Sequence, residues 1–165
     1  MSDLDPKLDP TLDPTLDLVL ERHVPVPPGK VWAAWTQPDL ILQWFTPAPW
    51  KTVECKVDLR PGGQFHTLMR GPAGEEHASD GCFLEVAAPG RLVWTSALGP
   101  GYRPHPVQHI DLAFTCVLTF AAKGSGTVYT ARAIHGSAAA AKAHAEMGFH
   151  AGWGAALDQL VALMA

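Results

Sequence analysis

The chain has 165 residues, of which 47% are hydrophobic and 17% charged, with 15 glycines and 15 prolines. A chain of this length buries roughly 70% of its unfolded surface, so we expect a single compact domain. The 12 lysines and arginines against 16 acidic residues give a net charge of −4. This balance argues against proteins that neutralise nucleic acid or an anionic membrane surface, and neither partner is expected.

The cellular setting is predicted from what the chain lacks. It has neither a signal-peptide pattern nor an apolar run long enough to span a membrane, which predicts a cytoplasmic protein. Cys55, Cys82 and Cys116 are far apart and form no CxxC pair, so we expect no disulfide framework and no thiolate zinc site. Each lies in a strand-like run and is predicted to be a small buried hydrophobe. No metal and no cofactor are expected.

The N-terminus carries a four-residue repeat, read from Leu4 as LDPK, LDPT, LDPT and LDL. Proline at every fourth position disfavours helix and interior strand. Residues 1–15 are therefore predicted to form an extended acidic arm, followed by one domain over residues 16–165. The arm is either a solvated tail or a segment whose leucines dock on a groove of this chain or of a partner in a homodimer.

A strand over residues 16–24 is expected first, followed by two short helices over residues 29–36 and 38–45, the second with Pro38 at its first position. The chain from Lys51 to His135 alternates extended runs with Gly- and Pro-containing turns, of which Arg60–Gly63 fits a type II turn. Short turns join antiparallel neighbours. The six strands are predicted over residues 51–59, 63–71, 75–87, 91–98, 107–122 and 126–135.

The strand over residues 107–122 shows the clearest burial pattern. One face carries Ile110, Leu112, Phe114, Cys116, Leu118 and Phe120, and the other begins with His109 and Asp111, which we expect to be exposed. A sheet with one buried face needs a cover. The cover is predicted to be a long helix over residues 138–164, whose apolar stripe is Phe149, Trp153, Ala156, Leu160 and Leu163.

Glycines interrupt this predicted helix. Gly148 and Gly152 are four residues apart and would share one face of the helix. Each glycine lowers helix stability by about 1 kcal/mol relative to alanine. They indicate either close packing of the helix on the sheet or space for a ligand beneath it.

Several segments, in this order and spacing, resemble a known family. They are Val31-Trp32-Ala33-Ala34-Trp35-Thr36, Pro38-Asp39, Gln43-Trp44-Phe45, Asp58-Leu59-Arg60-Pro61-Gly62-Gly63-Gln64-Phe65, Gly81, Arg91-Leu92-Val93-Trp94-Thr95 and His150-Ala151-Gly152-Trp153. The family is the activator of Hsp90 ATPase homologue 1-like (AHSA1-like) family, C-terminal domain type. It belongs to the START-like superfamily, also called SRPBCC, Bet v 1-like or polyketide cyclase-like. The resemblance implies an α+β helix-grip fold, β-α-α-β6-α, in which a curved antiparallel sheet wraps around a long C-terminal helix.

The same resemblance implies a cavity between the sheet and the long helix, used in the superfamily for apolar small molecules. The chain is rich in aromatic residues, which favours an aromatic-lined cavity with a few polar groups. The segment over residues 99–106 is either a rim of this cavity or an ordinary surface loop. The predicted cavity residues are Trp44, Phe45, Trp50, Phe65, Met69, Trp94, Tyr102, Arg103, Phe114, Met147, His150 and Trp153.

Three functions are compatible with this sequence. The first is a binding protein that holds a small apolar or aromatic molecule. The second is a cyclase- or hydrolase-type enzyme that uses His66 or His150 as acid/base. The third is an Hsp90-related co-chaperone or interaction module, ranked last because the co-chaperones of the family carry a separate N-terminal domain, whereas here a 15-residue arm precedes the first strand.

The remaining histidines offer weaker signals. His66 and His77 fall on neighbouring predicted strands and, with Asp80 or Glu76, could form a metal or acid/base site or be solvated. His144 and His150 are six residues apart, which places them on different faces of a helix. No metal site is therefore predicted.

Overall fold

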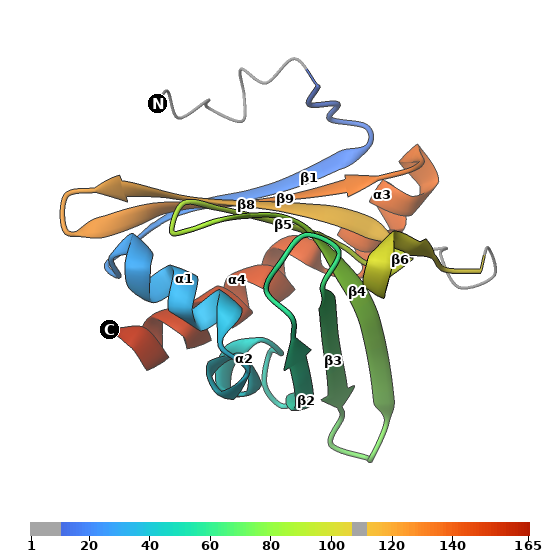
Figure 1. Cartoon of the computed structure of the whole chain (residues 1–165), viewed down its shortest axis with the longest axis horizontal. Coiled ribbons are helices and arrows are strands. Elements are labelled where there is room, and N and C mark those ends of the chain that lie inside the picture. Colours follow the sequence, from blue (N-terminus) through green and yellow to red (C-terminus); the bar gives the residue numbers. More distant parts are fainter. Residues whose placement is uncertain (1–10, 107–111) are drawn as a thin grey trace.

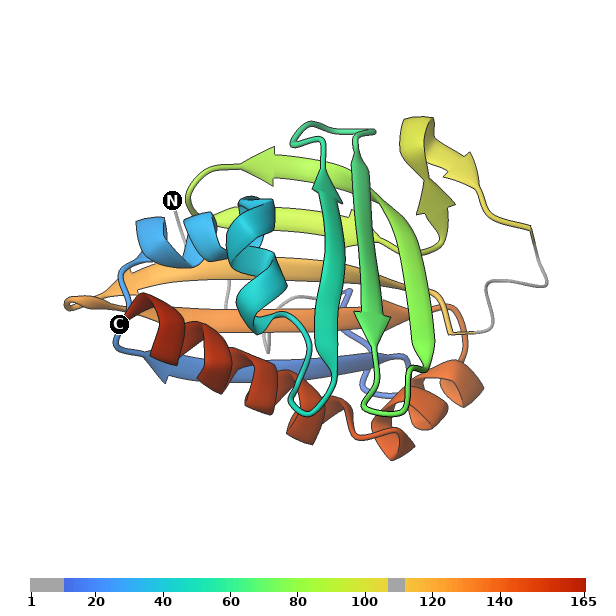
Figure 2. The same cartoon turned by 90° about the horizontal axis from the view of Figure 1, so that it is seen from below.

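The computed structural model describes residues 11–106 and 112–165 of the chain. In these residues seven strands form one antiparallel sheet in the order β1-β9-β8-β5-β4-β3-β2. The sheet is strongly curved, and α1, α2 and α4 lie on its concave side (Figures 1 and 2). The predicted α+β helix-grip fold is confirmed. The elements are β1 (Asp17–Val24), α1 (Pro28–Thr36), α2 (Pro38–Trp44), β2 (Lys51–Val57), β3 (Gln64–Arg70), β4 (Glu76–Ala87), β5 (Arg91–Thr95), β6 (Leu98–Gly99), β7 (Arg103–Pro104), β8 (Phe114–Lys123), β9 (Gly126–His135), α3 (Ala138–Glu146) and α4 (Phe149–Met164).

Local sequence signals account for the first helices and turns. Pro28 and Pro38 occupy the first turns of α1 and α2, where a missing N–H costs nothing, and the extended Gln37 separates the two helices. The predicted type II turn before β3 is also present. Gly62 has φ +82°, and the amide of Gly63 donates to the carbonyl of Arg60 at 2.8 Å.

The alternation predicted for β8 is confirmed within the strand. Cys116, Leu118 and Phe120 are buried on the face toward the helices, whereas the residues between them are half-buried. The predicted start at residue 107 is wrong, because β8 begins at Phe114. Leu112, expected on the core face, is 46% exposed. The predictions for His109, Ile110 and Asp111 lie outside the described residues.

The segment over residues 99–106 contains a small hairpin. Strands β6 and β7 pair through Leu98 with Pro104 and Gly99 with Arg103, and a 3₁₀ turn, Pro100–Tyr102, joins them. The ring of Tyr102 lies over Gly62, where a Cβ would come within 2.9 Å of its Cε2 atom. The hairpin is thereby packed against the turn that precedes β3.

The single C-terminal helix predicted over residues 138–164 is wrong, because the chain forms two helices, α3 and α4. Gly148 separates them with φ +91°, a left-handed conformation that side chains disfavour. It follows the C-cap Met147, and its amide donates to the carbonyl of Ala145 at 3.0 Å. Glycine at this position ends a helix and allows the chain to change direction.

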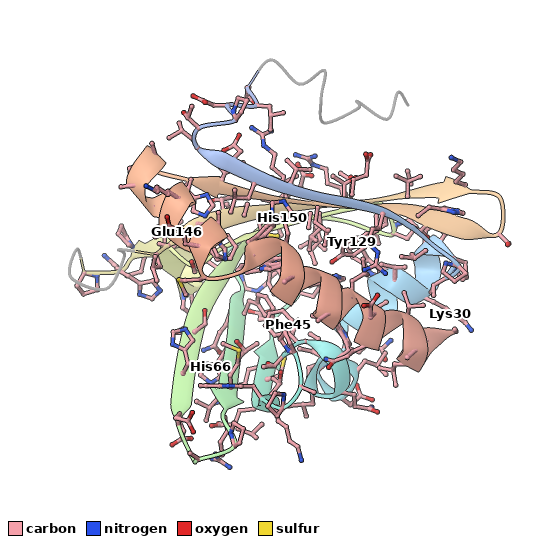
Figure 3. All side chains as sticks on the ribbon, turned by 180° about the vertical axis from the view of Figure 1, so that it is seen from behind. Lys30, Phe45, His66, Tyr129, Glu146 and His150 are labelled. Carbon is pink, nitrogen blue, oxygen red and sulfur yellow. The ribbon has the colours of Figure 1, made fainter. Side chains whose placement is uncertain are left out.

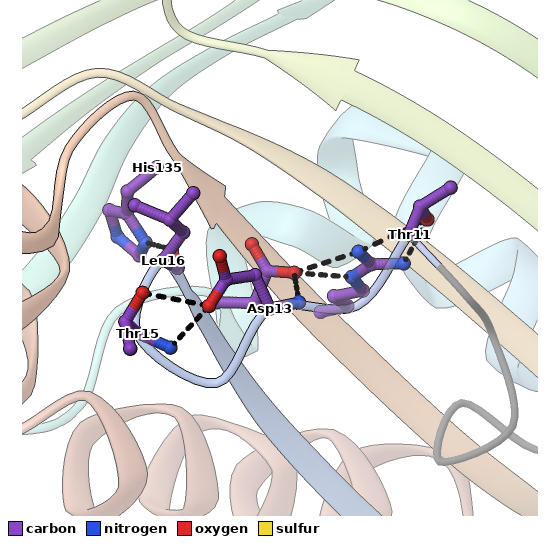
Figure 4. Close-up of polar contacts among 7 residues, drawn as sticks. Thr11, Asp13, Thr15, Leu16 and His135 are labelled. Carbon is purple, nitrogen blue, oxygen red and sulfur yellow. Dashed lines mark hydrogen bonds and ion pairs between the residues drawn. The ribbon is translucent and has the colours of Figure 1, made fainter.

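The last residues of the N-terminal arm contact the convex face of the sheet (Figure 4). Arg132 on β9 donates to Asp17 Oδ2 through Nη2 at 2.7 Å and through Nε at 3.2 Å. The amide of Asp13 donates to the same oxygen at 3.1 Å, and Thr11 Oγ1 accepts from Arg132 at 3.3 Å. The repeat therefore contacts the domain from Thr11 onward, while residues 1–10 of the predicted arm lie outside the described residues.

The core is centred on Trp35, which is 1% exposed and contacts the rings of Trp44, Phe45 and Trp94. Among the cysteines, Cys82 and Cys116 are buried as predicted. Cys55 is half-buried, and burial raises its pKa to about 11. In the described ranges, no helix has the length and apolar character needed to cross a membrane.

Candidate functional site

A cavity of about 710 Å³ lies between the concave face of the sheet and helix α4. Its described walls come from α1 and α2, from strands β3, β4, β5, β8 and β9, and from α3 and α4. Nine of the described lining residues are Trp, Phe or Tyr, and two of them, Phe45 and Tyr129, lie in the interior between α4 and the sheet (Figure 3). Leu112 and Met147 also line it, although they are 46% and 67% exposed, so they lie at its opening.

Many residues predicted from the sequence line this cavity. Strand alternation turns Phe65 and Met69 of β3 to the concave side, and the helix period turns Trp153 of α4 to the same space. Trp35 and Tyr129 also line it but were not among the predicted residues. The predicted residues found in the wall are Trp44, Phe45, Phe65, Met69, Trp94, Phe114, Met147 and Trp153. Their role in binding a ligand stays a prediction.

Other predicted cavity residues lie outside the described wall. Trp50 covers the turn at Gly71, where a Cβ would come within 2.9 Å of its Cε2 atom. Tyr102 and Arg103 are exposed on the small hairpin. His150 follows the inward-facing Phe149 by 100° of helix rotation, and its Nε2 lies 3.1 Å from the carbonyl of Val19 on β1. Their predicted placement in the cavity is therefore wrong.

Of the two alternatives for His66 and His77, a shared metal or acid/base site is not formed. His66 is directly opposite Asp80 in the β3–β4 register, whereas His77 is opposite Met69 and lines the cavity. His77 shares a face of the sheet with its cross-strand partner Met69, which is three residues from His66 along β3. Because successive side chains of a strand alternate between faces, the two histidines lie on opposite faces of the sheet. His66 Nδ1 lies 3.6 Å from Asp80 Oδ1. Among the described residues, no cluster of three or more His, Cys, Asp or Glu side chains could hold a metal ion.

A pair of histidines that the sequence analysis did not connect lies at the cavity wall. His135 Nε2, at the end of β9, is 2.8 Å from Nδ1 of His144 on α3, and His144 lines the cavity. The other nitrogen of His135, Nδ1, lies 2.8 Å from the carbonyl oxygen of Leu16. Burial, and after it the facing His135, lower the pKa of His144 from 6.5 to about 4. His144 is therefore neutral at pH 7.

A second polar group in the wall is the indole of Trp94. Trp94 is 5% exposed. Its Nε1 is fully buried and has no hydrogen-bond partner among the described residues. The ring packs edge-to-face on Phe65 at 5.1 Å and lies 5.5 Å from Phe114. The wall thus combines aromatic surface with a buried N–H donor and a neutral imidazole.

Comparison with known proteins identifies this architecture. The family model described as "Activator of Hsp90 ATPase homolog 1-like protein" matches residues 25–165. The chain belongs to the activator of Hsp90 ATPase homolog 1-like family.

Solved structures show the same fold as this family member. A protein from Nitrosomonas europaea is 46% identical, with 92% of this chain and 96% of that chain covered and a TM-score of 0.88. A protein from Mycobacterium smegmatis is 26% identical over 92% of this chain and 91% of that one, with a TM-score of 0.76. The AHSA1-like protein from Aeromonas hydrophila is 25% identical over 88% and 90%, with a TM-score of 0.67. A search of curated proteins found no match.

The family resemblance first read from short segments is thereby confirmed. In this member of the activator of Hsp90 ATPase homolog 1-like family, several of those segments supply the cavity wall. They contribute Trp35, Trp44, Phe45, Phe65, Trp94, Gly152 and Trp153. The family motifs and the cavity therefore coincide over much of their extent.

The buried histidine pair predicts how stability depends on pH in this family member. Above pH 6.5 His144 is neutral in the folded and unfolded chain, so it contributes no pH dependence. Between pH 6.5 and 4, His144 is protonated in the unfolded chain but not in the folded chain. Its contribution therefore lowers the free energy of unfolding as pH decreases, and this contribution stops changing below pH 4. Because the ring is only half-buried, we expect a loss of about 1–2 kcal/mol.

Urea unfolding at about pH 7 and at about pH 4.5 checks this expectation, with His144→Phe as the comparison. The variant should lose less stability than the wild type over the same interval, since it lacks the group whose pKa differs between the folded and unfolded chain. Equal losses in the two proteins would contradict the assignment to His144.

Proposed function

We propose that this protein binds a small, largely apolar, aromatic molecule in the cavity between the sheet and α4. The observation that carries the proposal is the cavity of about 710 Å³, whose wall includes nine Trp, Phe and Tyr side chains. Binding sites for small molecules are typically about 300–1,000 Å³, mostly apolar, with a few placed polar groups. Protein interiors otherwise pack densely, so a space of this size calls for an occupant.

Gly152 supports this proposal. It lies on the same face of α4 as Phe149, Trp153 and Ala156, which line the cavity with it. A Cβ added there meets no atom within 4 Å. The sequence predicts that the helix glycines allow either close packing or space for a ligand. Gly152 does not allow close packing, because its missing side chain leaves open space.

Gly152 also provides the test. Gly152→Leu places four carbons in the cavity and is expected to weaken the binding of N-phenylnaphthylamine, a hydrophobic fluorescent probe, by about tenfold or more. Gly152→Ala is the matched control, which fills little space and is expected to raise the free energy of unfolding by about 0.5–1 kcal/mol. Probe fluorescence titrations measure the first effect, and urea unfolding measures the second.

Saturable one-site binding by the wild type and Gly152→Ala, lost in a folded Gly152→Leu, is the expected result. Equal affinity in all three proteins would place the probe outside the cavity and contradict the proposal. Absence of binding to the wild type, for this probe and for a panel of aromatic compounds, would also contradict it.

Neither candidate residue of the catalytic alternative lies in the described cavity wall. His66 lies 3.6 Å from Asp80, and His150 contacts the backbone of β1. The histidine and carboxylate side chains in the described wall are instead His77, Asp80, His105 and His144, none of which is one of the two predicted catalytic candidates, and we therefore place binding before catalysis. The cytoplasmic location stays a prediction from the sequence, the homodimer through the N-terminal arm stays one of two alternatives for the arm, and the Hsp90 partnership stays the function ranked last.

A further inference from the structure

The hydrogen bonds of the histidine pair determine which nitrogens carry protons. The carbonyl oxygen of Leu16 can only accept, so His135 Nδ1, at 2.8 Å, must donate to it. In a neutral imidazole the other nitrogen is then an acceptor. His135 Nε2 therefore accepts from His144 Nδ1 at 2.8 Å, which leaves His144 Nε2 without a proton.

His144 Nε2 is the free end of this chain of hydrogen bonds. Among the described residues no hydrogen bond to it is found, and it is not one of the fully buried unpaired atoms. Aromatic rings surround the imidazole, with Phe114 at 4.8 Å and Phe149 at 5.2 Å between ring centroids. Both rings line the cavity with His144, and Trp153 contacts each of them, at 6.1 and 5.2 Å. The imidazole that carries this lone pair thus lies among aromatic rings of the wall.

We propose that His144 Nε2 accepts a hydrogen bond from the ligand, and that the ligand class is an aromatic molecule with a neutral hydroxyl group, of which a phenol or naphthol is the simplest form. This inference rests on the proposed binding function and specifies its polar contact. The backbone of Leu16 fixes the tautomer through His135, so no side chain has to change its proton on binding.

The chemistry of the wall selects among ligands. A carboxylate offers only lone pairs and would be repelled by the unprotonated Nε2. A hydrocarbon or an aryl ether fits the aromatic surface, but once bound it displaces water from the imidazole without offering Nε2 a donor, which is unfavourable. An aromatic molecule with a hydroxyl group suits both the aromatic surface and the imidazole, because its ring packs on the neighbouring rings while its O–H donates to Nε2.

The experiment compares naphthol with its methyl ether, methoxynaphthalene, by calorimetric or fluorescence titration. The wild type is expected to bind naphthol about two- to tenfold more tightly, the range for one hydrogen bond. His144→Phe keeps a ring at this position but removes the acceptor, and should bind both compounds equally. His150→Phe is the matched control, since that histidine lies outside the described cavity wall, and should keep the wild-type preference.

An imidazole nitrogen spectrum of the wild type provides a readout that does not depend on a variant folding. His144 is expected as the Nδ1–H tautomer, and its Nε2 resonance should move on addition of naphthol and stay in place with the ether. Equal affinities for the two compounds in the wild type, an unchanged preference in His144→Phe, or an Nε2–H tautomer would each overturn the inference. If neither compound binds the wild type, the inference is overturned, and the titration with N-phenylnaphthylamine shows whether the proposed binding function fails as well, so the two failures are distinguishable.

Discussion

Replacing Arg132 by methionine is expected to lower the free energy of unfolding by about 3–5 kcal/mol. Arg132 and Asp17 form an ion pair in which the side chains are 9% and 2% exposed. Methionine removes the guanidinium but leaves the Asp17 carboxylate buried, where its described remaining partner is the amide of Asp13. A carboxylate without a cation in such a place is far less stable than one in water.

The double variant Arg132→Met/Asp17→Leu is the control. Replacing both members of a buried ion pair with apolar side chains of similar size is often neutral or stabilising, so the double variant should recover most of the lost stability. Urea unfolding of the wild type, both single variants and the double variant gives the coupling energy. A cost below about 1 kcal/mol for Arg132→Met would indicate a solvated pair and contradict the burial of Asp17.

Trp35→Ala is expected to cost about 3–5 kcal/mol, the range for truncating a buried tryptophan. Trp35 is 1% exposed and packs on Trp44, Phe45, Trp94 and Trp153. Its Nε1 also donates to the hydroxyl of Tyr129 at 3.1 Å. Truncation therefore removes the ring that joins α1 to both walls of the cavity and leaves a buried hydroxyl without its donor.

Tyr129→Phe separates the hydrogen bond from the packing. This variant keeps both rings and leaves the Trp35 N–H unpaired, so it should cost less, about 1–3 kcal/mol. Burial holds the pKa of Tyr129 well above its usual value, so the hydroxyl remains protonated across the working pH range. Chemical unfolding of both variants measures the two effects, and equal costs would show that ring packing around Trp35 contributes little.

Features set by near neighbours in the chain could be predicted from the sequence. The prolines that start α1 and α2, the turn at Arg60–Gly63 and the inward alternation of Cys116 and Leu118 all follow from local backbone preferences. The resemblance to a family then supplied the arrangement of these elements. Most aromatic residues of the cavity wall could be predicted from the two together.

The errors concern contacts between distant segments. An alanine-rich run with glycines fits either one helix or two, and the left-handed Gly148 decides between them only in the folded chain. His150 follows the inward-facing Phe149 directly in α4, and its contact with Val19 of β1 joins segments that are distant in the sequence. His135 and His144 lie in different elements, so no helical or strand period relates them, although the alternation along β9 from Tyr129 would have placed His135 on the inner face.

The pairing of β1 with β9 has a consequence for how the chain folds. It joins Asp17 to Ile134 and Val24 to Thr127. The first strand can therefore pair with its neighbour only after most of the polypeptide has been synthesised. Contacts of such high sequence separation slow folding, and during synthesis they form late. Leu16, whose carbonyl accepts from His135, directly precedes β1, so this hydrogen bond forms when β1 pairs with β9. The polar end of the cavity is therefore completed late in folding, as is the contact of Trp35 with Trp153 across the aromatic part of the wall.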